Sequence, residues 1–340
     1  MIVIDGSEGE GGGQVLRTAL SLSLVTGQPF RIENIRANRS RAGVMRQHVT
    51  AVEAACAIGG TECEELAVGA STLSFTPGKV KPGEHHFAVG TAGSTSLVLQ
   101  TILPPLMLAD APSRLVLEGG THNIYAPPFD FIDRVFLPIL NRMGPRVTAK
   151  LGRHGFYPAG GGRIEVEIEP SPSLARLDLL ERGELRSVEA RAVVAALPGE
   201  IAVRELEAVE KILGWPEERR RIEQLPERIG PGNILMLEAV FEHVTEIMSG
   251  FGKLGVPAQT IGEQASKRMA GYLASDAIAG PYLADQLLLP MALAGGGSFT
   301  TVKPSSHART GAEVIARFLP ISVSFEEKQD RHHLVTVSTT

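Results

Sequence analysis

One histidine of this sequence lies in a segment that could carry nucleophilic chemistry. His307 belongs to the polar stretch Lys303-Pro-Ser-Ser-His-Ala-Arg-Thr310, which we expect to form a loop between a strand and a helix. Loops on a rigid scaffold often carry functional side chains, and a neutral imidazole can act as a nucleophile. Taken alone, a histidine in such a segment is more often structural or solvent-exposed than catalytic. The doublets His85-His86 and His332-His333 lack the i,i+4 spacing of helical metal ligands, and we expect both at the surface.

A glycine-rich run near the start of the chain could bind an anion. The run Gly9-Glu-Gly-Gly-Gly-Gln14 precedes an apolar helical segment, and helix N-termini present unpaired N–H groups. The run lacks the G-x-x-x-x-G-K-[ST] pattern, which argues against a Walker-type ATPase. Two interpretations stay open. The run is either a tight strand-to-helix turn, or a phosphate site at which the Glu10 carboxylate holds a divalent cation.

Five arginines gather in a short segment of an otherwise acidic chain. Residues 31–48 contain Arg31, Arg36, Arg39, Arg41 and Arg46 against a single acid, Glu33. Guanidinium groups bind phosphate bidentately, so Arg36 and Arg39 predict an anion site. Gln47 and His48 follow closely and are counted with this site. The alternative is a solvated basic surface.

The composition excludes several classes of protein. The 340 residues are 43% hydrophobic and 21% charged, which excludes wholesale disorder. The formal net charge of −5 excludes a bulk nucleic-acid coat, so nucleic acid would have to bind at a local patch. Proline and polar residues interrupt the most apolar stretches, 97–108 and 283–293, and we find no N-terminal targeting signal. We therefore expect a cytoplasmic protein without a membrane span, with reduced thiols at Cys56 and Cys63.

The same order of elements recurs three times. The first copy has expected helices at 14–26 and 48–57 and strands at 30–35 and 72–76. The second has helices ending at 109 and 143 and strands at 114–117 and 163–168. The third, from residue 283, has strands at 298–302, 322–326 and 334–337 and a helix at 312–318. Because one pair of helices cannot cover a sheet alone, we expect the copies to pack into one large domain.

A segment of different character separates the second copy from the third. Residues 183–275 predict a strand at 188–197, a charged helix at 201–213, strands within 234–248 and a helix at 258–274. We interpret this segment as a smaller α/β domain inserted into the large one. The predicted boundaries are 1–182 and 276–340 for the large domain and 183–275 for the insertion.

Five motifs, in order, make this sequence resemble the RNA 3′-terminal phosphate cyclase family. They are Gly9-Glu-Gly-Gly-Gly-Gln-Val-Leu-Arg17, Arg46-Gln-His48, Arg153-His-Gly-Phe-Tyr-Pro-Ala-Gly-Gly-Gly162, Tyr282-Leu-Ala-Asp-Gln286 and Ser305-Ser-His307. The resemblance covers essentially the whole chain. It implies an ATP-dependent ligase that converts an RNA 3′-phosphate end into a 2′,3′-cyclic phosphodiester and releases AMP and pyrophosphate. It also implies an α+β fold, with three repeated units of two helices on a four-stranded sheet and the smaller α/β domain inserted between the second and third units.

The resemblance further implies the site residues and their ligands. It implies covalent attachment of AMP to His307 and a metal contact to Glu10. Nucleotide contacts are implied for Gln100, Pro127, Phe131, Tyr282, Leu283, Ala284, Asp285 and Gln286. Contacts to the terminal RNA phosphate are implied for Arg17, Arg36, Arg39, Gln47 and His48. The cofactors would be ATP and a divalent metal, Mg²⁺ or Mn²⁺, and the partner an RNA with a 3′-phosphate end. Aromatic residues are only 5%, so we expect RNA recognition to stop near the terminus.

Two other classes of protein, and the oligomeric state, stay open at this point. A non-catalytic cyclase-like protein of ribosome assembly would share the fold but lack the nucleophile, and His307 with Arg309 nearby argues against it. An enolpyruvyl transferase, built from similar repeats, would have a small-molecule anion site and undergo no adenylylation.

Overall fold

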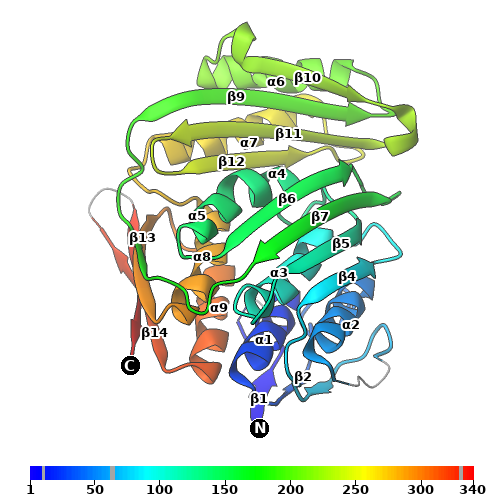
Figure 1. Cartoon of the computed structure of the whole chain (residues 1–340). Coiled ribbons are helices and arrows are strands. Elements are labelled where there is room, and N and C mark those ends of the chain that lie inside the picture. Colours follow the sequence, from blue (N-terminus) through cyan, green and yellow to red (C-terminus); the bar gives the residue numbers. More distant parts are fainter. Residues whose placement is uncertain (10–11, 62–65, 329–331) are drawn as a thin grey trace.

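The computed structural model of the chain describes residues 1–9, 12–61, 66–328 and 332–340 (Figure 1). The strands form four separate sheets of mixed parallel and antiparallel pairing, with helices packed against them. The fold is therefore α+β, as predicted. One sheet lies at the top of Figure 1, and the other three form the body below it.

The first sheet has the strand order β1-β2-β3. Its elements are β1 (Ile2–Asp5), α1 (Gly13–Thr26), β2 (Phe30–Glu33), α2 (Arg46–Gly59) and β3 (Leu73–Phe75). Helix α1 buries Leu16, Leu20 and Leu24, which the period of 3.6 residues places on one face. It ends at Gly27, whose φ of 71° is left-handed and suits glycine. Among the described residues this sheet has three strands, where four were predicted.

The second sheet has the order β4-β5-β7-β6. Its strands are β4 (Gly83–Ala88), β5 (Ser113–Gly119), β6 (Arg146–Arg153) and β7 (Gly162–Glu169). Helix α3 (Thr95–Leu106) begins at the cap residue Ser94, whose hydroxyl accepts from Leu97 N. A second helical stretch runs through α4 (Phe129–Phe131), η1 (Ile132–Phe136) and α5 (Leu137–Asn141). The sequence did not predict β4 or β6, because both strands carry charged or histidine side chains at many positions.

The third sheet joins the end of the chain to a distant strand. Its order is β14-β15-β13-β8, with β8 (Leu177–Leu179), β13 (Gly296–Thr301), β14 (Ile321–Glu327) and β15 (His333–Thr339). Strand β8 pairs in parallel with β13. Helices α8 (Pro281–Leu293) and α9 (Ser306–Phe318) pack against each other and against this sheet.

The strands of the fourth sheet all come from the segment 183–275, which we predicted to be an insertion. Its order is β10-β9-β11-β12, with β9 (Leu185–Ala195), β10 (Arg220–Leu225), β11 (Gly232–Phe241) and β12 (Thr245–Phe251). Helices α6 (Glu200–Leu213) and α7 (Ala258–Leu273) pack against each other and against this sheet, which lies at the top of Figure 1. The short turns η2 (Glu217–Arg219) and η3 (Glu227–Ile229) flank β10.

Two local predictions are wrong. The helix predicted at 312–318 begins at Ser306, because the Ser305 hydroxyl accepts from Ala308 N at 2.9 Å and caps the helix there. His307 therefore lies in the first turn of α9, where we predicted a loop. Cys56 is disulfide-bonded, which contradicts the prediction of a reduced thiol; Cys63 lies outside the described residues.

Within the described ranges, no helix combines the length and the apolar character needed to cross a membrane.

Candidate active site

His307 is held from one side by the start of the chain. Its Nδ1 lies 2.6 Å from Oε1 of Gln14, the second residue of α1. With a carbonyl oxygen as the acceptor, Nδ1 carries the proton and Nε2 keeps the lone pair. The neutral ring is therefore oriented with Nε2 as its nucleophilic nitrogen.

Small residues allow α1 and α9 to approach each other at this point. A Cβ on Gly311 would lie 3.2 Å from Gln14 Nε2. A Cβ on Gly9 would overlap the Thr310 hydroxyl, and the φ of Gly9 is +60°. Gly9 is thus packed against α9, and Gln14 lies within reach of His307.

A carboxylate approaches His307 from α8. Asp285 Oδ1 accepts a hydrogen bond of 2.6 Å from the hydroxyl of Ser305, the residue that caps α9. Burial raises the pKa of Asp285 to about 6, against the opposing effects of the Ser305 hydrogen bond and the charge of His307. Burial lowers the pKa of the His307 imidazole; the Asp285 charge opposes that shift, and nearby arginine charges add to it. The balance favours a neutral imidazole at neutral pH.

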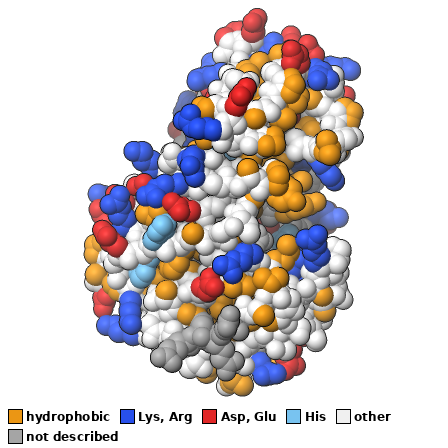
Figure 2. Space-filling model, turned by 90° about the vertical axis from the view of Figure 1, so that its right-hand side faces the viewer, with side chains coloured by type: hydrophobic (Ala, Val, Ile, Leu, Met, Phe, Trp, Pro, Cys, Tyr) orange, Lys and Arg blue, Asp and Glu red, His pale blue; other side chains and the backbone are white. Residues whose placement is uncertain are grey.

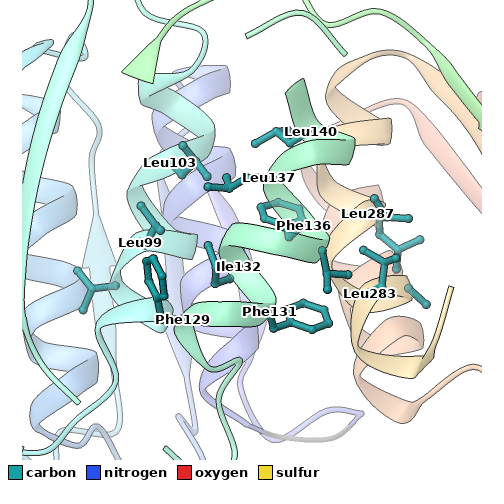
Figure 3. Close-up of a cluster of buried hydrophobic side chains, with 14 of the residues drawn as sticks. Leu99, Leu103, Phe129, Phe131, Ile132, Phe136, Leu137, Leu140, Leu283 and Leu287 are labelled. Carbon is teal, nitrogen blue, oxygen red and sulfur yellow. The ribbon is translucent and has the colours of Figure 1, made fainter. Parts of the chain in front are cut away.

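Some of the remaining residues of the predicted nucleotide site are at least partly exposed, and the others are buried. Gln100 on α3 donates to Gln286 on α8 at 2.5 Å, which joins two of them directly. Tyr282, in the first turn of α8, is 47% exposed. Leu283, Ala284 and Phe131 are almost fully buried, backbone and side chain alike, so a ligand could not contact them without rearrangement. Figure 3 shows Phe131 and Leu283 in the apolar cluster between the α4–α5 stretch and α8. Pro127 is half-buried in the loop before α4.

The predicted phosphate residues Arg17 and His48 meet at the start of α1. A Cβ on Gly13 would overlap His48 Nε2 and lie 2.9 Å from Arg17 Nη1, so glycine leaves space for both side chains. Burial, with the added charges of Arg17 and Arg36, lowers the pKa of His48 to about 3. Its Nδ1 accepts from Met45 N, so the neutral ring carries its proton on Nε2 and can donate there.

Arg36 binds the backbone of the loop that carries it. Arg36 has a φ of +56°, and its guanidinium donates to the carbonyls of Gly43 and Arg41 at 3.1 Å each. Burial lowers the pKa of Arg36, and burial with the charge of Arg36 lowers that of Arg17 to about 10. Gln47 accepts from Ser94 N at 3.4 Å.

Arg39 is exposed, and its charge is one of those that lower the pKa of His307. Glu10, the predicted metal ligand, lies outside the described residues. Across the described ranges, no group of three or more His, Cys, Asp or Glu side chains could hold a metal ion.

The structure thus brings His307, Arg17 and His48 to the start of α1. Gln14 and Ser305, which the predicted site omits, link His307 to α1 and to Asp285. A signal for Ser305 is present in the sequence, since serine two residues before His307 is a favoured helix cap. No local pattern indicates Gln14, because its partner is 293 residues away.

Known proteins resemble this chain over nearly its whole length. Residues 8–325 match the RNA 3'-terminal phosphate cyclase family. Proteins of that name from Koribacter versatilis and Ralstonia nicotianae are 56% and 49% identical to this chain, in each case over 97% of it. These alignments cover 93% and 94% of the two relatives. The RNA 3'-terminal phosphate cyclase of Salmonella typhimurium is 46% identical to this chain, over 99% of both chains. This chain therefore belongs to the RNA 3′-terminal phosphate cyclase family, which makes it an enzyme by descent.

Proposed function

We propose that this chain uses ATP to convert the 3′-phosphate end of an RNA into a 2′,3′-cyclic phosphodiester, acting as a ligase. One observation carries the proposal. In this member of the family, Gln14 orients the half-buried imidazole of His307, and the charges of Asp285, Arg17 and Arg39 act on its pKa. A non-catalytic relative would have no need for an oriented, neutral histidine.

His307 takes the role of nucleophile in this proposal. Its Nε2 attacks the α-phosphorus of ATP, an N–P bond forms, and the P–O bond to pyrophosphate breaks. The Nδ1 proton stays on the ring, directed at Gln14, and stabilises the imidazolium that forms. Asp285 compensates part of that positive charge.

The RNA end reacts next. An oxygen of the 3′-phosphate attacks the histidine-bound phosphorus, forms an anhydride and returns the imidazole with its lone pair. The neighbouring 2′-hydroxyl then attacks the 3′-phosphorus, its proton passes to solvent, and AMP leaves. Because the hydroxyl is already adjacent, this step is intramolecular. Arg17, Arg36, Arg39, Gln47 and His48 would bind the terminal phosphate, as cations or as neutral donors.

ATP would lie along α8 at the end that carries Tyr282. The exposed Tyr282 ring offers a stacking surface for adenine, and the Gln100–Gln286 pair offers polar contacts. Pro127 would contact the nucleotide, and the buried Phe131, Leu283 and Ala284 would support the site from the core behind it. We keep Glu10 as the proposed ligand of a divalent cation, Mg²⁺ or Mn²⁺, that offsets phosphate charge, and we assign no step to it.

We also propose that the chain is organised as three repeated units with one insertion, with boundaries at 1–182, 183–275 and 276–340. Three sheets, each with two helices or helical stretches, support the repeat. The fourth sheet and its helices α6 and α7 come from one continuous segment, which supports the insertion. The cytoplasmic location stays a prediction.

Incubation with ATP and a short RNA that ends in a 3′-phosphate tests the function. The terminal phosphate should become resistant to phosphatase, and AMP and pyrophosphate should be released in equal amounts. An end that stays sensitive to phosphatase in the presence of ATP and metal would overturn the proposal. An enolpyruvyl transferase would release neither AMP nor pyrophosphate.

A further inference from the structure

Two tyrosine rings project into solvent from neighbouring loops of the second sheet. Tyr125 is 89% exposed and lies between β5 and α4; Tyr157 is 73% exposed and lies between β6 and β7. Both loops leave the same end of the sheet, at the right-hand side of Figure 1. Figure 2, which faces this side, shows hydrophobic and basic side chains together beneath the upper sheet.

The loops that carry these rings are firmly bound to each other. Thr121 N donates to Gly155 O at 2.9 Å, and Gly155 N donates back to the Thr121 hydroxyl at the same distance. The ring of Phe156 is buried against His122, so the next residue, Tyr157, faces outward. The Tyr157 loop is closed by Gly160 N, which donates to Phe156 O at 2.6 Å.

Tyr125 is also held in place. Its φ of +70° is left-handed, a conformation that is costly for a bulky residue and is kept only where the surroundings enforce it. Asn123, two residues earlier, donates to Ala92 O, and His122 bonds Asp130 at 2.9 Å. The backbone that carries each ring is therefore fixed, so only the side-chain rotamers of the two tyrosines have to be ordered on a ligand.

These loops adjoin the residues proposed to bind the terminal phosphate. The 90–94 loop lies between the two sets: a Cβ on Gly160 would lie 2.9 Å from Thr91 O on one side, and Ser94 N donates to Gln47 on the other. Arg46, at the start of α2, donates to Val89 O just before that loop. Arg46 and Arg153 are both exposed along this path.

We propose that Tyr125 and Tyr157 stack on bases of the single-stranded RNA that lead to the 3′-phosphate. This inference rests on the proposed function, which supplies the RNA. Aromatic rings that alternate with arginines are the general means of binding single strands without sequence preference, since every base has a flat face. Two rings serve a few nucleotides, which agrees with the low aromatic content of the chain.

The affinity for RNA tests this inference without requiring catalysis. A fluorescent, single-stranded RNA of about eight nucleotides with a 3′-phosphate would be titrated with the wild type and with Tyr125→Ala, Tyr157→Ala and the double variant. We expect Kd to rise about tenfold for each ring removed, and Tyr157→Phe to bind like the wild type. Leu185→Ala is the control, because Leu185 is exposed at the start of β9, whereas Gly232, which packs against Phe156, pairs with the other end of that strand.

Two further measurements separate this inference from the proposed function. The KM for ATP and the kcat on a mononucleoside 3′-phosphate should be unchanged in the double variant, because neither substrate reaches the rings. A chain that binds RNA through the tyrosines but forms no cyclic end would refute the proposed function alone. Unchanged RNA affinity in the double variant, equal loss in Leu185→Ala, or a raised KM for ATP would overturn the stacking surface.

Discussion

Gln14 and His307 lie 293 positions apart in the chain, and their side chains meet at 2.6 Å. This contact fixes the proton on Nδ1 and leaves the Nε2 lone pair for chemistry. The orientation of the proposed nucleophile therefore depends on the packing of α1 against α9, two helices from distant parts of the sequence.

Replacing Gln14 should slow the attack on ATP without unfolding the chain. One hydrogen bond is worth about 0.5–1.5 kcal/mol, so Gln14→Ala should lower the rate of self-adenylylation about tenfold. Gln14→Glu retains an acceptor and adds a negative charge, so it should raise the pKa of His307 and move the acid limb of the reaction to higher pH. Single-turnover rates over a pH series measure both effects, and identical limbs in Gln14→Glu and the wild type would refute this role.

Asp285 should tune the pH at which His307 reacts. The nucleophile must be neutral, so adenylylation rises with pH through the pKa of His307, which burial places below the ordinary value of about 6.5. The Asp285 charge raises that pKa. Asp285→Asn removes this effect, and the acid limb should move further down. A limb that moves up, in rates measured between about pH 5 and 8, would contradict the assigned electrostatics.

A buried carboxylate of the fourth sheet holds the start of α8. Glu246 on β12 is fully buried and accepts from Gly280 N, at the cap of α8, at 2.6 Å and from Ile247 N at 3.0 Å. Burial raises its pKa to about 7. Because α8 carries Tyr282 and Asp285, this contact ties the fourth sheet to the candidate nucleotide site.

Glu246→Gln should therefore weaken ATP binding. The Gln side chain can accept only through its Oε1, so Gly280 N at the cap of α8 and Ile247 N on β12 can no longer both keep a partner. We expect the KM for ATP to rise about tenfold with kcat largely retained. Glu205→Gln is the matched control, since Glu205 is equally buried on α6 and its pKa is also raised to about 7 by burial. Equal KM values in the two variants, with equal losses of thermal stability, would leave Glu246 a purely structural role.

Arg39 should serve the RNA end more than ATP. Arg39→Ala should spare self-adenylylation at about pH 8, where His307 is neutral in either protein, and raise the KM for 3′-phosphate RNA about tenfold. Arg31→Ala is a suitable control, because Arg31 is paired with Glu33 on β2. If both steps fall equally in Arg39→Ala, the arginine binds ATP instead.

The elements of the fold could be predicted where one physical signal dominates. The apolar period of α1 and the glycine that ends it are local, so the prediction of 14–26 differs from the observed helix by one residue. Strand β4, Gly83–Ala88, was missed because its charged and histidine side chains obscure the alternation. The start of α9 was missed because the predicted boundary followed its apolar residues, and the cap at Ser305 lies about two turns earlier.

The candidate site could likewise be predicted only in part. The motifs single out His307 and Asp285 as candidate reactive residues, whose roles stay a prediction. Their contacts could not be predicted, because Gln14 and Ser305 act through partners on other elements. The buried state of Phe131, Leu283 and Ala284 likewise depends on packing between α8 and the α4–α5 stretch, which no local pattern contains.

The most direct test is covalent labelling of His307. Wild-type protein incubated with α-labelled ATP and Mg²⁺, without RNA, should acquire one label that acid removes and alkali does not, as an N–P bond requires. His307→Ala should acquire none, while His86→Ala, which alters an exposed histidine of β4, should label like the wild type. Labelling of His307→Ala at the wild-type level, or a label that survives acid, would contradict the account.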